Sequence, residues 1–308
     1  MLKLTKYLTG RIMLQKIYTG LIKPEYILRP FQLVHRLTNK IPQNKIIELK
    51  LPWNSPFELK SSDDIGRTIF HLGFYELSLS ELIWRAIEKS DSFIDVGTNI
   101  GYFTSLALAN KNFNGKVTSF EPHPELIKAA KKNIDFTNKA NRVDLLEYAL
   151  SDQDGEATLF IPVDMENNNG LASLERPEDA IGSEIQVQVK RLDDLVSNDI
   201  KHIIKIDTEG HEASVLKGAT KLLESGSLEV IFFEEHASPD EAETFKILKE
   251  YDYNILRIDR GFWGPKLSEP NSINQQKKWQ PVNYVAIKNN NQKFDFLNDS
   301  SWKIISDN

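Results

Sequence analysis

Residues 92–102 read SFIDVGTNIGY, and this stretch decides the fold. Its first five residues form a short, largely apolar run of strand length, and glycines at positions 97 and 101 flank the turn that follows. A mostly apolar segment of helical length then extends to about residue 110. The pattern predicts a strand at 92–96 that enters a helix at about 99–110 through a glycine turn.

The same alternation of strand and helix continues on both sides of this unit. Apolar or alternating runs predict further strands at 45–51, 116–121, 142–148, 202–207, 228–234, 254–258 and 283–287. Helical spacing predicts helices at about 79–89, from 124 onward, at 211–225 and at 240–250, and Ser78 and Glu81 have the spacing of a capping box for the first of these. Residues 156–190 predict an inserted β-hairpin region with a long polar loop at 166–183. Strands that alternate with helices form a mostly parallel sheet covered on both faces, so we expect an α/β fold.

Composition and charge narrow the possible functions. The chain has 308 residues and no cysteine, which excludes disulfides and cysteine nucleophiles. Its net charge is −6, but residues 1–40 carry eight basic residues against Glu25 alone, or +7, so the remainder carries −13. An acidic body argues against a large nucleic-acid-binding surface. Charges interrupt every apolar stretch near the start, so we expect neither a signal peptide nor a membrane-spanning helix, and a cytoplasmic location.

The mixture of apolar and basic side chains in residues 1–40 predicts short helices. Two interpretations of these helices stay open. They form a helical cap that packs on the domain, or a basic amphipathic surface that meets anionic lipid or a partner as a peripheral contact.

The glycine turn has the position of a ligand-binding element. Ligands of parallel α/β sheets bind beyond the carboxyl ends of the strands, where glycines let the backbone approach closely. A dinucleotide-binding turn would read G-x-G-x-x-G, whereas Asn99 and Tyr102 replace its second and third glycines. A phosphate-free, cationic ligand such as S-adenosylmethionine therefore fits better, with Asp95, Gly97 and Gly101 at its site. The structural alternative is a plain strand-to-helix turn.

An acidic residue ends the next predicted strand. Glu121 lies 20 residues after Gly101, where a carboxylate is expected to accept hydrogen bonds from ribose hydroxyls. Many strands end in glutamate, so Glu121 alone is weak evidence for a ligand site. Together with the glycine turn it is strong evidence. His123 is expected to be a solvated helix cap rather than a ligand.

Candidate catalytic residues follow the fourth and fifth strands. Asp207 ends the strand at 202–207, Glu209 lies two residues further on in the turn at Gly210, His211 starts the next helix, and His236 follows the strand at 228–234. In one interpretation His211 or His236 is a general base that a carboxylate holds in place. In another, Asp207 and partners bind Mg²⁺ through hard oxygen ligands. The structural alternative is a Lys205–Asp207 ion pair, with Glu209 at the helix N-terminus.

These segments together resemble the FkbM family of methyltransferases. The resemblance spans roughly residues 70–236 and lies in FIDVGTNIGYFT (93–104), SFEPHPE (119–125), YALSDQDG (148–155) and KIDTEGHEASVLKGA (205–219). Thr98 and Thr208 depart from the usual family residues, alanine and a β-branched aliphatic. The resemblance implies a class I methyltransferase fold, a Rossmann-like sandwich whose mostly parallel seven-stranded sheet has an antiparallel last strand.

The resemblance also implies a cofactor and a reaction. The cofactor is S-adenosylmethionine, bound by Gly97, Asn99, Gly101 and Glu121, with Ser151 or Asp152 near the adenine. The reaction is O-methylation of a sugar, glycolipid or polyketide hydroxyl, on a small-molecule or glycan acceptor. We expect an N-terminal extension at 1–70, the methyltransferase domain at 71–290 and a tail at 291–308. Two other functions stay open: N-methylation of a protein or nucleic acid, and a binding protein that has lost catalysis.

Overall fold

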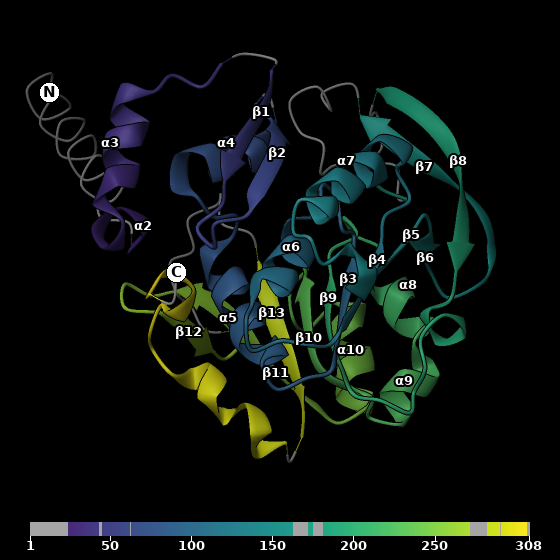
Figure 1. Ribbon diagram of the computed structural model, residues 1–308. Coiled ribbons are helices and arrows are strands. Elements are labelled where there is room, and N and C mark those ends of the chain that lie inside the picture. The colour runs from purple at the N-terminus through teal and green to yellow at the C-terminus, as the bar shows by residue number, and fades with distance from the viewer. Residues whose placement is uncertain are drawn as a thin grey trace, which may run out of the picture.

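The computed structural model describes residues 24–42, 45–61, 63–162, 172–174, 181–271, 282–289 and 291–306. An eight-stranded sheet forms its centre, in the order β12-β11-β13-β10-β9-β3-β4-β5 (Figure 1). The strands are β3 (Ser92–Val96), β4 (Lys116–Phe120), β5 (Val143–Leu146), β9 (His202–Ile206), β10 (Leu228–Glu234), β11 (Tyr253–Arg260), β12 (Pro265–Ser268) and β13 (Asn283–Lys288).

The pairing of these strands confirms the predicted α/β class. Strands β10, β9, β3, β4 and β5 pair in parallel. The last strand, β13, is antiparallel to both of its neighbours, β10 and β11. The sheet has eight strands rather than the predicted seven, because Pro265–Ser268 adds an edge strand antiparallel to β11.

Helices cover both faces of the sheet. Strand β3 shows how its alternating side chains divide between two cores, because Phe93 packs with one and Ile94 with the other. The first core includes α5 (Leu77–Ile87), α6 (Tyr102–Ala109) and α7 (Pro124–Asp135), and the second includes α8 (Glu212–Lys217), α9 (Thr220–Glu224) and α10 (Glu243–Glu250). Figure 1 shows these helices around the sheet.

The helix predicted over 211–225 is divided into α8 and α9. The carboxylate of Asp193 accepts hydrogen bonds from the backbone N–H groups of Lys221 and Leu222, at 2.9 and 3.1 Å. A side chain from the preceding segment therefore caps a new helix start, which the local sequence pattern did not reveal.

The predicted insertion is a small sheet of its own. Strands β6 (Ala149–Leu150), β7 (Gly155–Pro162) and β8 (Gly182–Lys190) form it in the order β6-β8-β7, and β7 and β8 are the arms of the predicted hairpin. Most of the predicted loop at 166–183 lies outside the described residues.

Segments at both ends of the described chain flank the predicted domain, and all of them except the first two helices contribute side chains to the first core. They comprise α2 (Pro24–Leu28), α3 (Pro30–Thr38), β1 (Ile46–Lys50), β2 (Pro56–Lys60), α4 (Asp64–Leu72), η4 (Gln292–Asn298) and α11 (Lys303–Ser306). Phe57 before the domain and Phe294 after it belong to the same buried cluster as Leu82 of α5. The predicted boundaries at 70 and 290 therefore do not separate independent hydrophobic cores.

The predicted capping box at the start of α5 is wrong. The helix begins at Leu77 after Glu76, which makes no side-chain capping hydrogen bond. Glu81 is instead fully buried, lies 2.5 Å from Arg85, and accepts hydrogen bonds from the backbone N–H groups of Lys303 and Ile304. A contact with residues more than 200 positions away thus replaces the local contact.

Candidate active site

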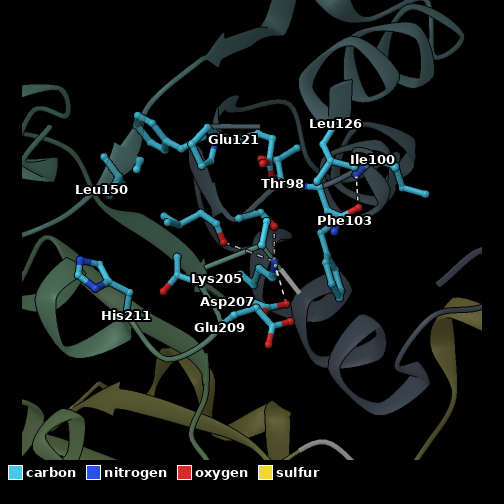
Figure 2. Close-up of a pocket in the computed structure, with 18 of the residues that line it drawn as sticks. Thr98, Ile100, Phe103, Glu121, Leu126, Leu150, Lys205, Asp207, Glu209 and His211 are labelled. Atoms are coloured by element: carbon cyan, nitrogen blue, oxygen red, sulfur yellow. Dashed lines mark hydrogen bonds and ion pairs between the residues drawn. The ribbon is translucent and has the colours of Figure 1, made fainter. Parts of the chain in front are cut away.

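A cleft opens where β3, β4 and β9 end, as the fold class requires for a ligand site. About 890 Å³ of empty space lies within it, a figure that includes the part open to solvent. Figure 2 shows Glu121 toward one end, Asp207 and Glu209 toward the other, and Lys205 between them. Apolar side chains, including Ile100, Phe103, Leu126 and Leu150, make up much of the wall.

Two glycines shape the turn between β3 and α6, and each has a reason for being glycine. Gly97 has φ +72°, and a Cβ there would lie 1.8 Å from the carbonyl oxygen of Asp207. Gly101 has φ +85°, and a Cβ there would lie 3.2 Å from the Cα of Ala130 in α7. Gly97 therefore permits the close approach of the turn to the end of β9, and Gly101 permits the packing of α6 on α7.

The predicted acidic residue at the end of β4 lines the cleft and is tied to this turn. Glu121 accepts one hydrogen bond from the backbone N–H of Asn99, at 2.8 Å, and another from that of His123, at 2.9 Å. Burial raises the pKa of Glu121 to about 7, against the opposing effect of these two hydrogen bonds. Each carboxylate oxygen keeps a lone pair for a ligand hydroxyl.

His123 is the predicted helix cap. Its Nδ1 accepts a hydrogen bond from the backbone N–H of Glu125 at 3.1 Å. Its side chain is buried rather than solvated, however.

Asp95 lies behind the wall of the cleft. Its fully buried carboxylate accepts a hydrogen bond from Thr104 Oγ1 at 2.7 Å and lies 3.6 Å from Lys205 Nζ. Burial raises the pKa of Asp95, and the charge of Lys205 opposes that rise. The structure therefore connects Asp95 to the cleft through Lys205; its predicted direct contact with a cofactor stays a prediction.

Lys205 is a central residue of the cleft that the sequence analysis treated only as an ion-pair partner. Its Nζ donates to the carbonyl oxygen of Gly97 at 2.8 Å, lies 3.3 Å from Asp207 Oδ2, and sits 5.2 Å from the ring centroid of Phe103. Burial lowers the pKa of Lys205, but the charges of Asp207 and Asp95 outweigh burial and raise it. The predicted Lys205–Asp207 ion pair is confirmed, and the lysine stays protonated.

Carboxylates gather at the end of the cleft opposite Glu121. Asp207 and Glu209 line it, and Glu76 and Glu234 lie near enough to raise the pKa of Glu209 or of each other. Burial first, and then repulsion from Asp207, raise the pKa of Glu209 to about 8 and that of Glu76 to about 7. The same causes raise the pKa of Glu234. This end of the cleft therefore holds protons close to neutral pH.

Backbone geometry marks two of these residues. Glu209 has φ +54° and Glu76 has φ +42°, values that L-residues seldom adopt. Asn99, in the glycine turn, has φ +53°. Such conformations cluster at functional sites because the surrounding structure must enforce them.

The two predicted histidines have different positions. His211 lines the cleft, and its Nε2 lies 2.9 Å from Oγ of the buried Ser151. His236 is 67% exposed, pairs with Glu234 at 3.2 Å, and is not among the residues that line the cleft. The structure thus brings Asp207, Glu209 and His211 together but leaves His236 outside.

Glu212, not Glu209, satisfies the turn before α8. Its carboxylate accepts from the backbone N–H groups of Thr208, at 2.8 Å, and of Gly210, at 3.1 Å. The structural alternative, in which Glu209 caps this helix, is therefore wrong, and its carboxylate is available to the cleft.

The predicted Mg²⁺ finds no support in the described residues. Within them, no three His, Asp or Glu side chains are placed to hold a metal ion.

None of the helices in the described part of the chain has the length and apolar character of a membrane-spanning segment.

Comparisons with known proteins identify relatives of this chain. A family profile described as a methyltransferase FkbM domain matches residues 95–255. The chain is similar to the hexuronic acid methyltransferase AglP of Haloferax volcanii, at 29% identity over 63% of this chain and 75% of that protein. It is also similar to methyltransferase 1 of Beauveria bassiana, at 28% identity over 57% of this chain and 77% of that protein.

Solved structures also show likeness. The methyltransferase FkbM from Methylobacillus flagellatus matches 64% of this chain and 44% of its own, at 20% identity and a TM-score of 0.39. The O-methyltransferase from Bacillus cereus in complex with SAH matches 70% of this chain and 83% of its own, at 13% identity and a TM-score of 0.36.

Proposed function

The chain belongs to the FkbM family of methyltransferases, and we propose that it transfers a methyl group from S-adenosylmethionine to a hydroxyl oxygen of a sugar or related natural product. The observation that carries the proposal is that the two ends of one cleft have different sets of residues. Glu121 and the glycine turn lie at one end, and the carboxylates of Asp207 and Glu209 lie at the other. A related protein named for a hexuronic acid supports a sugar-like acceptor.

The residues at the first end fit the proposed cofactor. The Glu121 carboxylate would accept hydrogen bonds from the two ribose hydroxyls, because it borders the cleft while its backbone contacts hold it still. The backbone of Gly97 lines the cleft and would border the cofactor, and the apolar walls at Leu126 and Leu150 suit an adenine ring. When bound, S-adenosylmethionine supplies an electrophilic methyl group next to a good leaving group.

Glu209 is the residue we assign as general base. A hydroxyl is a weak nucleophile, so its proton should leave as its oxygen accepts the methyl group. Glu209 lines the cleft and has a pKa of about 8, so it takes up a proton readily near neutral pH. Asp207 is paired with Lys205, which fixes its position and makes it a positioning group. Alignment of the acceptor and exclusion of water supply the rest of the rate enhancement.

The atom of the acceptor that receives the methyl group tests the proposed O-methylation. The protein would be incubated with methyl-labelled S-adenosylmethionine and a panel of neutral sugars, amino sugars, uronic acids and polyketide alcohols. Nuclear magnetic resonance of the labelled product would then locate the methyl group. A methyl ether supports the proposal, whereas transfer to nitrogen or carbon contradicts it. Glu209→Gln should slow product formation by about 10²-fold or more, and Glu147→Gln, a change at an exposed carboxylate, should leave the rate unchanged.

A further inference from the structure

Exposed apolar side chains concentrate near the N-terminus of the described chain. Ten large hydrophobic residues are exposed among the described residues, and six of them lie between positions 27 and 46. Phe31 is 86% exposed, Leu37 is 72% exposed and Val34 is 54% exposed, all on α3. Ile27 and Leu28 of α2 are about half exposed. Soluble proteins seldom gather so many exposed apolar side chains on one short segment without a binding role.

The exposed apolar residues of α3 lie along one face of the helix, and other residues of α3 contact α4. Phe31, Val34 and Leu37 are spaced three residues apart, which places them along one face. On another face, Gln32 Nε2 donates to the carbonyl oxygens of Phe70, at 3.2 Å, and His71, at 3.1 Å. The ring of His35 also packs on Phe70, with centroids 4.8 Å apart. The helix is therefore docked on α4, and its apolar row faces away from that contact.

The charge beside this row has one sign. In residues 24–42 and 45–46, the sole acidic residue is Glu25, which is buried and paired with Arg260. The basic residues of the same segment are Arg29, Arg36, Lys40 and Lys45, and the two lysines are exposed. These four basic residues and the one acidic residue give this described segment a net charge of +3, whereas the whole chain carries −6. An anionic surface would attract this end of the protein and repel the rest, which fixes an orientation.

We propose that the α2–α3 face, defined as Ile27, Leu28, Phe31, Val34 and Leu37, docks on the surface of an anionic lipid bilayer. A row of apolar side chains flanked by basic residues is the pattern of helices that lie in the membrane interface. A bilayer needs no matching shape, which suits a row without a groove. The binding is peripheral, with the apolar side chains inserted among the headgroups and the basic side chains near anionic lipid.

Helix α4 connects the proposed surface to the cleft. Helix α3 contacts the Phe70–His71 end of α4, and Ile65 at the other end of α4 lines the cleft. Figure 1 shows α3 at the outer edge of the molecule beside α4. Docking would therefore bring the cleft near the lipid surface, where a membrane-bound acceptor would be within reach.

Vesicle flotation with the full chain tests this proposal. Vesicles of phosphatidylcholine alone would be compared with vesicles that contain one quarter phosphatidylglycerol, at low and high salt. We expect binding to the anionic vesicles, weak binding to the neutral ones, and a clear loss at high salt. The double variant Phe31→Asp/Leu37→Asp should bind at least tenfold more weakly.

The matched control places the same charges on other exposed apolar residues. The double variant Ile181→Asp/Ile200→Asp should bind like the unchanged protein, because both positions are exposed but lie outside the α2–α3 face. Thermal melts would establish that both double variants fold. Absence of binding to anionic vesicles, or equal binding by the two double variants, would overturn the proposal. So would a change from dimer to monomer in Phe31→Asp/Leu37→Asp without vesicle binding, which would assign the face to contact between copies.

Discussion

The backbone N–H of Asn99 lies 2.8 Å from Oε2 of Glu121, so the turn after β3 is joined directly to the end of β4. Asn99 adopts φ +53° to make this contact. A left-handed residue in the turn thus fixes the carboxylate that borders the cleft. The position of Glu121 therefore depends on two strand ends rather than one.

The proposed base predicts a pH profile. Glu209 must be deprotonated to accept a proton, and its pKa is about 8. We expect kcat to rise with pH and to level off above about pH 8. Glu209→Gln should lower kcat by about 10²-fold or more, the usual contribution of a general base, with little change in affinity for the cofactor. Steady-state kinetics of both proteins from pH 6 to 9 would check this, and an unchanged kcat in Glu209→Gln would remove Glu209 from the mechanism.

The buried carboxylates also predict that the protein is less stable at alkaline pH. The pKa values of Glu76 and Glu121 are about 7 and that of Glu209 is about 8, against the ordinary 4.5. The folded protein therefore holds protons that the unfolded chain releases. This contribution to stability is complete below about pH 4.5 and is lost as pH rises through 7 to 8.

Calorimetric melts would measure that loss. Each unit of pKa shift corresponds to about 1.4 kcal/mol, so Tm should fall between pH 5.5 and pH 8.5. Glu209→Gln should reduce the drop, and Glu147→Gln, at an exposed site, should leave it unchanged. A Tm that rises over this range would show that the carboxylates are stabilised as anions.

The contact between Gly97 and Asp207 predicts that position 97 does not tolerate a side chain. In Gly97→Ala the new Cβ would lie 1.8 Å from the Asp207 carbonyl oxygen, at a residue with φ +72°. Gly226 has a similar φ of +64° but meets only the flexible end of Lys288, at 3.5 Å. Gly226→Ala should cost about 1 kcal/mol from backbone strain, and Gly97→Ala should cost at least about 2 kcal/mol more, because backbone must move. Urea denaturation would compare the two, and equal costs would contradict the close approach of β3 and β9.

The sequence predicted the parts of the structure that depend on local pattern. The strand-end positions of Gly97, Glu121 and Asp207 followed from the alternation of strands and helices, and the structure places all three at one cleft. The antiparallel strand β13 was also predicted, from family resemblance.

Contacts between distant segments account for what the sequence did not reveal. Glu81 looked like a local cap, but the backbone of Lys303 and Ile304 competes for its carboxylate. Glu209 and Glu212 are both acidic residues near one helix start, and only the folded turn shows that Glu212 makes the capping contacts. His236 follows a strand that ends near the cleft, yet its side chain is solvent-exposed. Lys205 could have been found, because a lysine inside an apolar strand needs a charged partner.

The central claim is that Glu121 and the glycine turn form a cofactor site, and calorimetric titration with S-adenosylhomocysteine tests it most directly. The unchanged protein should bind with micromolar affinity, and Glu121→Ala should bind at least tenfold more weakly, a loss of about 1.4 kcal/mol. Glu147→Ala, at an exposed carboxylate, should bind like the unchanged protein. Absence of binding by the unchanged protein, or equal affinity of Glu121→Ala, would contradict the account.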